Sequence, residues 1–180
     1  MGLFNRTGDK SKQNPPAVEM GWRYVAYREG REGLVFQIEP MVKGPDTVYV
    51  PDEASWTTEA PQWARHRRSD ILEYLRSVAW NRELEWRSLP TDFSVPGAVP
   101  GSIESTPGGE ELENERLFHA GAPITAEQAR EVWHQAVRSF VSQAEGQVTI
   151  YAAELIPNSV FADIEIPGLR ANPNVQLDLR

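Results

Sequence analysis

Apolar and polar residues alternate in the first part of the chain, which is typical of β-strands. Strand-forming residues fill 22–27 and 34–38, and the turn between them, 29–33, contains two glycines. Within 34–38 every second residue is apolar, so these side chains share one face of a strand. The two runs therefore predict a β-hairpin, and a short run over 47–50 between two prolines predicts a third strand.

Two longer stretches repeat their apolar residues every three or four positions, which is the period of an α-helix. The first begins at Pro61, a residue tolerated in a first helical turn, and runs to about residue 81. The second covers about 125–145, because Thr125 and Gln128 form a capping box at its start and Gly146 follows its end. Its apolar face holds Ala129, Val132, Trp133, Ala136, Val137, Phe140 and Val141.

Four later stretches also indicate strands, and three of them, 83–87, 160–166 and 175–179, alternate. These stretches predict strands at 83–87, 147–153, 160–166 and 175–179. The predicted order of elements has no regular strand–helix–strand repeat, which argues against a parallel α/β sheet. We therefore expect an α+β fold, in which the two main helices pack on a mostly antiparallel sheet.

The predicted domain organisation follows from local composition. Residues 1–20 are polar and offer little apolar surface to bury, so they are expected to form a flexible head. Residues 21–180 have the length of a single domain. Within it, 90–115 is expected to be a long loop, since 90–109 contain four prolines and four glycines without any periodicity.

The overall composition restricts the classes of function. The formal net charge of −8 argues against nucleic-acid binding, which needs clustered lysine and arginine. The absence of cysteine excludes disulfides, thiolate metal sites and cysteine nucleophiles. No apolar run has the length of about 18 residues that a membrane helix needs, and the N-terminus lacks the apolar region of a signal peptide. We expect a cytoplasmic protein that does not contact membranes.

Candidate catalytic and metal-binding residues have simpler explanations. His66, Asp70 and Glu73 share one face of the first predicted helix, but such sets are common on solvated helices, so no metal is predicted. His134, with an arginine four residues away on each side, is interpreted as part of a solvated basic ridge. The chain has no nucleophile-elbow or phosphate-loop motif, and no cofactor is expected.

Two carboxylate pairs have strand spacing, and close carboxylates can divide the roles of acid and base. They are Glu83 with Glu85 and Asp163 with Glu165. Both pairs alternate with apolar neighbours, as the outer face of a half-buried strand does. We interpret them as outer-face residues.

Two features favour protein binding instead. On the first predicted helix, a stripe about 120° from the apolar face consists of Trp63, Arg67, Asp70 and Tyr74. Tryptophan, tyrosine and arginine are enriched at interface hot spots, although the same stripe would arise if the helix were buried on two sides. The second feature is an acidic segment in the predicted loop. Its residues are Glu110, Glu111, Glu113 and Glu115.

Charge is also unevenly distributed along the chain. Residues 61–82 carry five arginines and two acids, whereas 83–116 carry eight acids and two arginines. An acidic surface would steer a cationic partner toward the protein. The sequence therefore predicts a non-catalytic protein-binding domain, of the type of a bacterial immunity inhibitor or an adaptor. A small enzyme with scattered carboxylates and histidines, and a structural subunit of a larger or self-associating assembly, are the alternatives.

Overall fold

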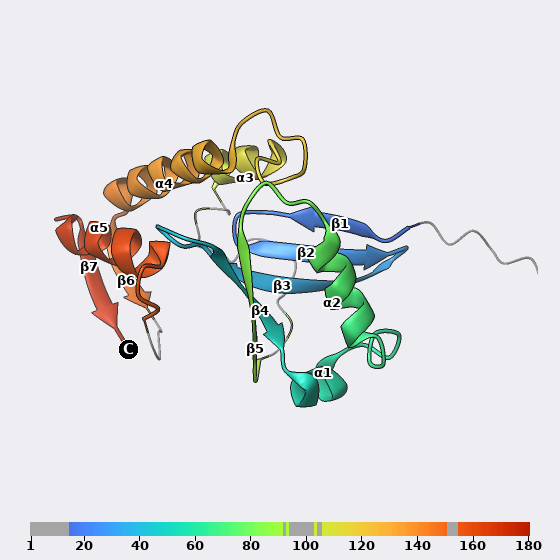
Figure 1. Ribbon diagram of the computed structural model, residues 1–180. Helices are drawn as coiled ribbons and strands as arrows, with labels where there is room; N and C mark the ends of the chain where they lie inside the picture. Colours follow the sequence, from blue (N-terminus) through green and yellow to red (C-terminus); the bar gives the residue numbers. More distant parts are fainter. Residues whose placement is uncertain (1–14, 92, 94–102, 104–105, 151–154) are drawn as a thin grey trace, which may run out of the picture.

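A computed structural model of the chain describes residues 15–91, 93, 103, 106–150 and 155–180 (Figure 1). A five-stranded sheet has the order β1–β2–β3–β4–β5. Its strands are β1 (Ala17–Met20), β2 (Tyr24–Glu29), β3 (Glu32–Glu39), β4 (Asp46–Pro51) and β5 (Leu84–Leu89). Neighbouring strands from β1 to β4 are antiparallel, and β5 runs parallel to β4. With the helices described below, this sheet confirms the predicted α+β class.

The predicted hairpin forms between β2 and β3. Tyr27 faces Leu34 across the hairpin, and Val25 faces Phe36. All four side chains are buried, as the alternation indicated. Gly30 occupies the turn with a φ of 60°, a backbone conformation that favours glycine.

The helix predicted over 61–81 is shorter than expected, and a separate helix precedes that region. α1 (Glu53–Glu59) begins at Asp52, whose side chain accepts a hydrogen bond from the Ser55 N–H. α2 (Arg68–Ser77) begins seven residues after Pro61. The prediction that Pro61 opens a helix was wrong. Pro61 instead restricts the backbone of the residue before it and so ends the preceding helix. A residue preceding proline prefers extended backbone, and Ala60, with ψ of 141°, ends α1 there.

The second main helix is α4 (Ala126–Gln143), close to the predicted 125–145. The capping box of Thr125 and Gln128 is present in both directions. Trp133 and Val137 are buried as predicted, whereas Phe140 is only half-buried. None of the helices among the described residues is long and apolar enough to cross a membrane.

The C-terminal part is a separate small layer next to the end of α4 (Figure 1). β6 (Gly146–Ile150) and β7 (Val175–Leu179) pair in parallel, and they do not join the five-stranded sheet. Between them lie a π-helical turn, Phe161–Glu165, and α5 (Ile166–Ala171). The predicted strand over 160–166 is therefore wrong. Ser159 starts a helical turn, with its hydroxyl accepting from the Ala162 N–H, and apolar residues at 160, 164 and 166 fit a helix as well as a strand.

Two segments differ from the predicted loop and head. The acidic segment lies on a helix, α3 (Pro107–Asn114), which Thr106 caps by accepting from the Gly109 N–H. A threonine cap followed by proline and an early glutamate is a helix start, so the prediction of a loop over this part of 90–115 was wrong. β1 lies inside the predicted head 1–20, and it pairs with β2. Residues 1–14, and residues 92, 94–102, 104 and 105 of the predicted loop, lie outside the described residues.

The main core joins the sheet to α2 and α4. Trp22, just before β2, stacks on Trp133 of α4 with ring centroids 5.2 Å apart. Ile71 and Leu75 of α2 are fully buried in the same cluster. Figure 1 shows α2 crossing the sheet while α3 and α4 lie together beyond β1. This arrangement places the acidic helix α3 beside α4.

Candidate protein-binding surface

The aromatic stripe predicted on the first helix packs against the sheet. Trp63 stacks on Tyr27 of β2, with ring centroids 6.4 Å apart. Tyr74 meets the same tyrosine edge-on at 5.8 Å, and its hydroxyl donates to the Pro16 carbonyl oxygen at 3.0 Å. Both side chains are half-buried. The aromatic part of the stripe is therefore used within the molecule to hold α2 on β2.

Arg67 extends this contact with charge. Its guanidinium donates to both carboxylate oxygens of Glu29, at 2.8 and 2.7 Å. The hydrogen bonds from Arg67, and a further one from the Tyr27 hydroxyl, lower the pKa of Glu29 to about 2. Burial, together with the neighbouring Glu29, raises the pKa of Tyr27 to about 12. Of the four stripe residues, Asp70 alone is classed as exposed.

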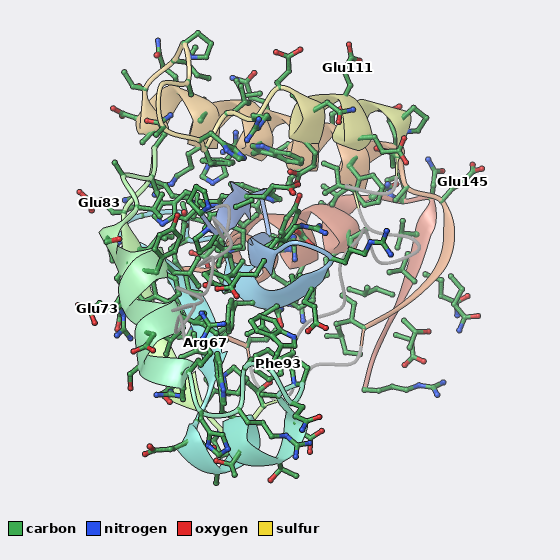
Figure 2. The ribbon with its side chains drawn as sticks, turned by 90° about the vertical axis from the view of Figure 1, so that its right-hand side faces the viewer. Arg67, Glu73, Glu83, Phe93, Glu111 and Glu145 are labelled. Atoms are coloured by element: carbon green, nitrogen blue, oxygen red, sulfur yellow. The ribbon has the colours of Figure 1, made fainter. Side chains whose placement is uncertain are left out.

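The acidic segment presents its charge on α3. Glu110, Glu111 and Glu115 are exposed, and Figure 2 shows Glu111 directed away from the body of the molecule. No basic residue lies in the last turn of α3. Glu110 lies in the first turn, where a carboxylate favours the helix dipole, whereas Glu115 at the C-terminal end opposes it, at a cost of about 0.3–1 kcal/mol. Arg116 follows the helix, and its guanidinium nitrogen lies 2.8 Å from Nδ1 of His119.

Glu113 behaves differently from its acidic neighbours. Its carboxylate accepts the Trp22 N–H at 2.8 Å and therefore lies toward the sheet. Gly21 allows this approach, because a Cβ at that position would lie 2.5 Å from the second Glu113 oxygen and would overlap the Tyr24 ring. Glu113 thus attaches α3 to the start of β2, which leaves the three exposed glutamates as the acidic surface.

A groove lies between α3 and α4. It has a volume of about 370 Å³, and Gly108, Gly109 and Leu112 line its α3 side. Ala136 and Phe140 line its α4 side, and Ile103 contributes from the preceding segment. Two successive glycines leave α3 without side chains where it faces α4, so the space between the helices stays open. The groove therefore shares the helix α3 with the acidic residues.

The residues considered for catalysis are dispersed. His66, Asp70 and Glu73 are all exposed, and within the described ranges no three acidic or histidine side chains are arranged to hold a metal. Glu85 pairs with Arg87 at 3.0 Å, and Glu165 pairs with Arg23. Asp163 and Glu165 lie on a helical turn, so they do not share a sheet face as their spacing suggested.

His134 is buried, which differs from its interpretation as part of a solvated ridge. Its ring meets Trp22 edge-on, with centroids 6.1 Å apart. Burial, with Arg138 nearby, lowers the pKa of His134 below its usual value. The periodicity of α4 gave no sign of this, because His134 lies at the border between the apolar and polar faces.

A pocket of about 490 Å³ lies beside the C-terminal layer. Lys43, Arg138 and Asp163 bring charges of both signs to it, and Asn158 adds an amide. Arg138 also contacts Glu131 at 3.3 Å. The lining therefore does not favour a ligand of one charge.

A buried ion pair joins Arg82 to Asp46, and no sequence pattern predicted it. Arg82 donates to Asp46, and both side chains are only 1% exposed. The Arg82 guanidinium also donates to the Gly21 and Trp22 carbonyl oxygens and lies 4.1 Å from the Phe118 ring centroid. The two residues are 36 positions apart, so no local pattern connects them.

Comparison with protein-family models, curated proteins and solved structures gives no match to this chain.

Proposed function

We propose that this chain is a non-catalytic protein-binding domain, an immunity-type inhibitor or an adaptor, whose partner carries positive charge where it meets α3. The observation that carries the proposal is the exposed acidic surface of Glu110, Glu111 and Glu115. Glu115 opposes the dipole at the C-terminal end of the helix, and the ion pairs among the described residues include none of these three carboxylates. A cationic partner would relieve their mutual repulsion and the conflict of Glu115 with the dipole.

The predicted stripe of Trp63, Arg67, Asp70 and Tyr74, of which only the last two lie on α2, is a weaker basis for the same function. Trp63, Arg67 and Tyr74 already contact Tyr27, Glu29 and Pro16, so a partner would reach only their outer edges. Their replacement would also disturb the packing of α2, which would make a loss of binding difficult to interpret. We therefore assign the partner surface to α3 and leave the stripe as a secondary candidate.

The test compares two variants with the same change in net charge. One carries Glu110→Gln, Glu111→Gln and Glu115→Gln. The control carries Glu59→Gln, Glu73→Gln and Glu83→Gln, all exposed; Figure 2 shows Glu73 and Glu83 on the side of α2. After affinity capture identifies a cognate partner, association rates are measured over a range of ionic strength.

Charges at the rim of an interface act mainly on association rates. We expect the α3 variant to associate several-fold more slowly at low salt and to lose most of its salt dependence. The control should associate almost like the wild type. Equal effects of the two variants would show that only net charge matters, and this outcome would refute α3 as the partner surface.

A further inference from the structure

The groove between α3 and α4 is lined by Gly108, where a larger side chain would find open space. Gly108 lies in a helix with ordinary helical backbone, and a Cβ at this position would meet no atom within 4 Å. Alanine would fit there and would favour the helix, since glycine is a poor helix former. The glycine relieves no close contact, and the absence of a side chain at this position leaves the groove open.

The apolar lining of the groove continues along α4. Val132, Ala136 and Phe140 are four residues apart, so they follow one another on one side of the helix. Val132 is 36% exposed, and Ala136 and Phe140 are partly exposed. From Val132 to the end of the groove at Ala144, the stripe extends for about 18 Å at 1.5 Å per residue. This length accommodates about three turns of a second helix.

The two rims of the groove differ in charge. Helical spacing places Glu111 and Glu115 on the solvent side of Gly108 and Leu112, so they border the groove along α3. On the opposite rim, Ser139 and Gln143 are uncharged. An occupant that is apolar on one face and basic along one edge would match both the lining and the charged rim.

We propose that this groove binds a basic amphipathic α-helix of the protein partner. The proposal rests on the proposed function and deepens it, because it names the structural class of the partner segment. Apolar side chains on one face of the helix enter the space above Gly108 and Leu112, between the two helices. Lysine or arginine side chains at its edge meet Glu111 and Glu115. This is the helix-in-groove mode of recognition, in which spaced apolar anchors supply affinity and rim charges set orientation.

The probe is a synthetic peptide of about 18 residues, with leucine at every third or fourth position and lysine elsewhere. Its controls are a scrambled peptide of identical composition and a peptide in which glutamate replaces lysine. Binding to the full chain is measured by fluorescence anisotropy, and peptide helicity by circular dichroism. The key variant is Gly108→Leu, which fills the groove; Ser69→Leu, at an exposed position of α2, is the matched control.

We expect the wild type and Ser69→Leu to bind the amphipathic peptide equally and to increase its helicity. Gly108→Leu should bind at least about tenfold more weakly, while its melting temperature stays equal or rises. Glu111→Gln with Glu115→Gln should weaken binding and reduce its salt dependence, relative to Glu73→Gln with Glu83→Gln. The scrambled and acidic peptides should bind at least about tenfold more weakly than the probe.

Several results would overturn the groove assignment. Unchanged binding to Gly108→Leu would refute it, and if the glutamate variants still lost affinity, the acidic surface of the proposed function would survive. Equal binding of the scrambled peptide would refute a helical occupant. A wild-type dimer in sedimentation that Gly108→Leu dissociates would show that the occupant is a second copy of this chain.

Discussion

Arg82 and Asp46 form an ion pair inside the protein, with the Arg82 Nε 2.8 Å from an Asp46 carboxylate oxygen. Asp46 begins β4, and Arg82 precedes β5, so the pair lies where the parallel strands start. The second Asp46 oxygen accepts the Met41 N–H at 2.6 Å. Arg82 further contacts the carbonyl groups before β2 and the Phe118 ring. One buried pair thus connects the sheet to the segment between α3 and α4.

Removal of one member of this pair should be strongly destabilising. In Asp46→Asn the Arg82 charge stays buried without its counterion, and we expect a loss of about 3–5 kcal/mol in the free energy of unfolding. Replacement of both residues, Asp46→Leu with Arg82→Met, should destabilise less than Asp46→Asn alone. Urea denaturation measures both. The exposed ion pair of Glu85 with Arg87 is the control, and Glu85→Gln should leave the midpoint of urea denaturation unchanged. A stable Asp46→Asn protein would contradict the central role of the pair.

The packing of α4 on the core predicts the cost of losing its tryptophan. Trp133 is buried and stacks on Trp22, so Trp133→Ala removes a large contact area and leaves a cavity. We expect a loss of about 3–5 kcal/mol in the free energy of unfolding. Val132→Ala, next in sequence but exposed, should change it by less than about 0.5 kcal/mol. Similar melting of the Trp133→Ala variant and wild type would show that this face is not part of the core.

The contact of Arg67 with Glu29 should make the free energy of unfolding depend on pH in the acidic range. The pKa of Glu29 is about 2 in the folded protein, below its ordinary value of 4.5. The stabilisation is therefore present above pH 4.5 and is lost as the pH falls toward 2. Arg67→Met should raise the Glu29 pKa and flatten the fall of melting temperature over this range. Carbon-detected NMR titration gives the pKa directly.

Arg31→Met is the control for this experiment, because Arg31 is exposed near the same hairpin turn. It should leave the pKa of Glu29 and the acid dependence as in wild type. A wild-type Glu29 that titrates near 4.5 would contradict the Arg67 contact in solution.

Metal addition tests the interpretation of the histidine trio. His66, Asp70 and Glu73 are exposed, and we interpret them as solvated surface residues. Zn²⁺, Mn²⁺ or Mg²⁺ should therefore leave the melting temperature unchanged. A rise of several degrees that disappears in His66→Ala would instead identify a metal site at the start of α2 and would favour the enzymatic alternative.

The sequence determined the elements whose signals are local. Alternation with a glycine turn predicted the β2–β3 hairpin, and the capping box with a long apolar stripe predicted α4 almost to its ends. Both depend on residues a few positions apart, which interact in much the same way in any fold. The α3 helix also has a local signal in Thr106, Pro107 and Glu110, but the surrounding prolines and glycines are typical of a loop.

Tertiary structure decided what depends on distant residues. Apolar positions at 160, 164 and 166 fit either a strand or a helix, and packing beside α4 selected the helix. The pairing of Asp46 with Arg82, and of Arg67 with Glu29, brings together charges 36 and 38 residues apart. Local sequence records that a residue is charged or aromatic, whereas its exposure depends on which other segments cover it. For this reason the sequence predicted an exposed position for Glu113 and for Trp63. In the folded protein Glu113 contacts Trp22 and Trp63 contacts Tyr27.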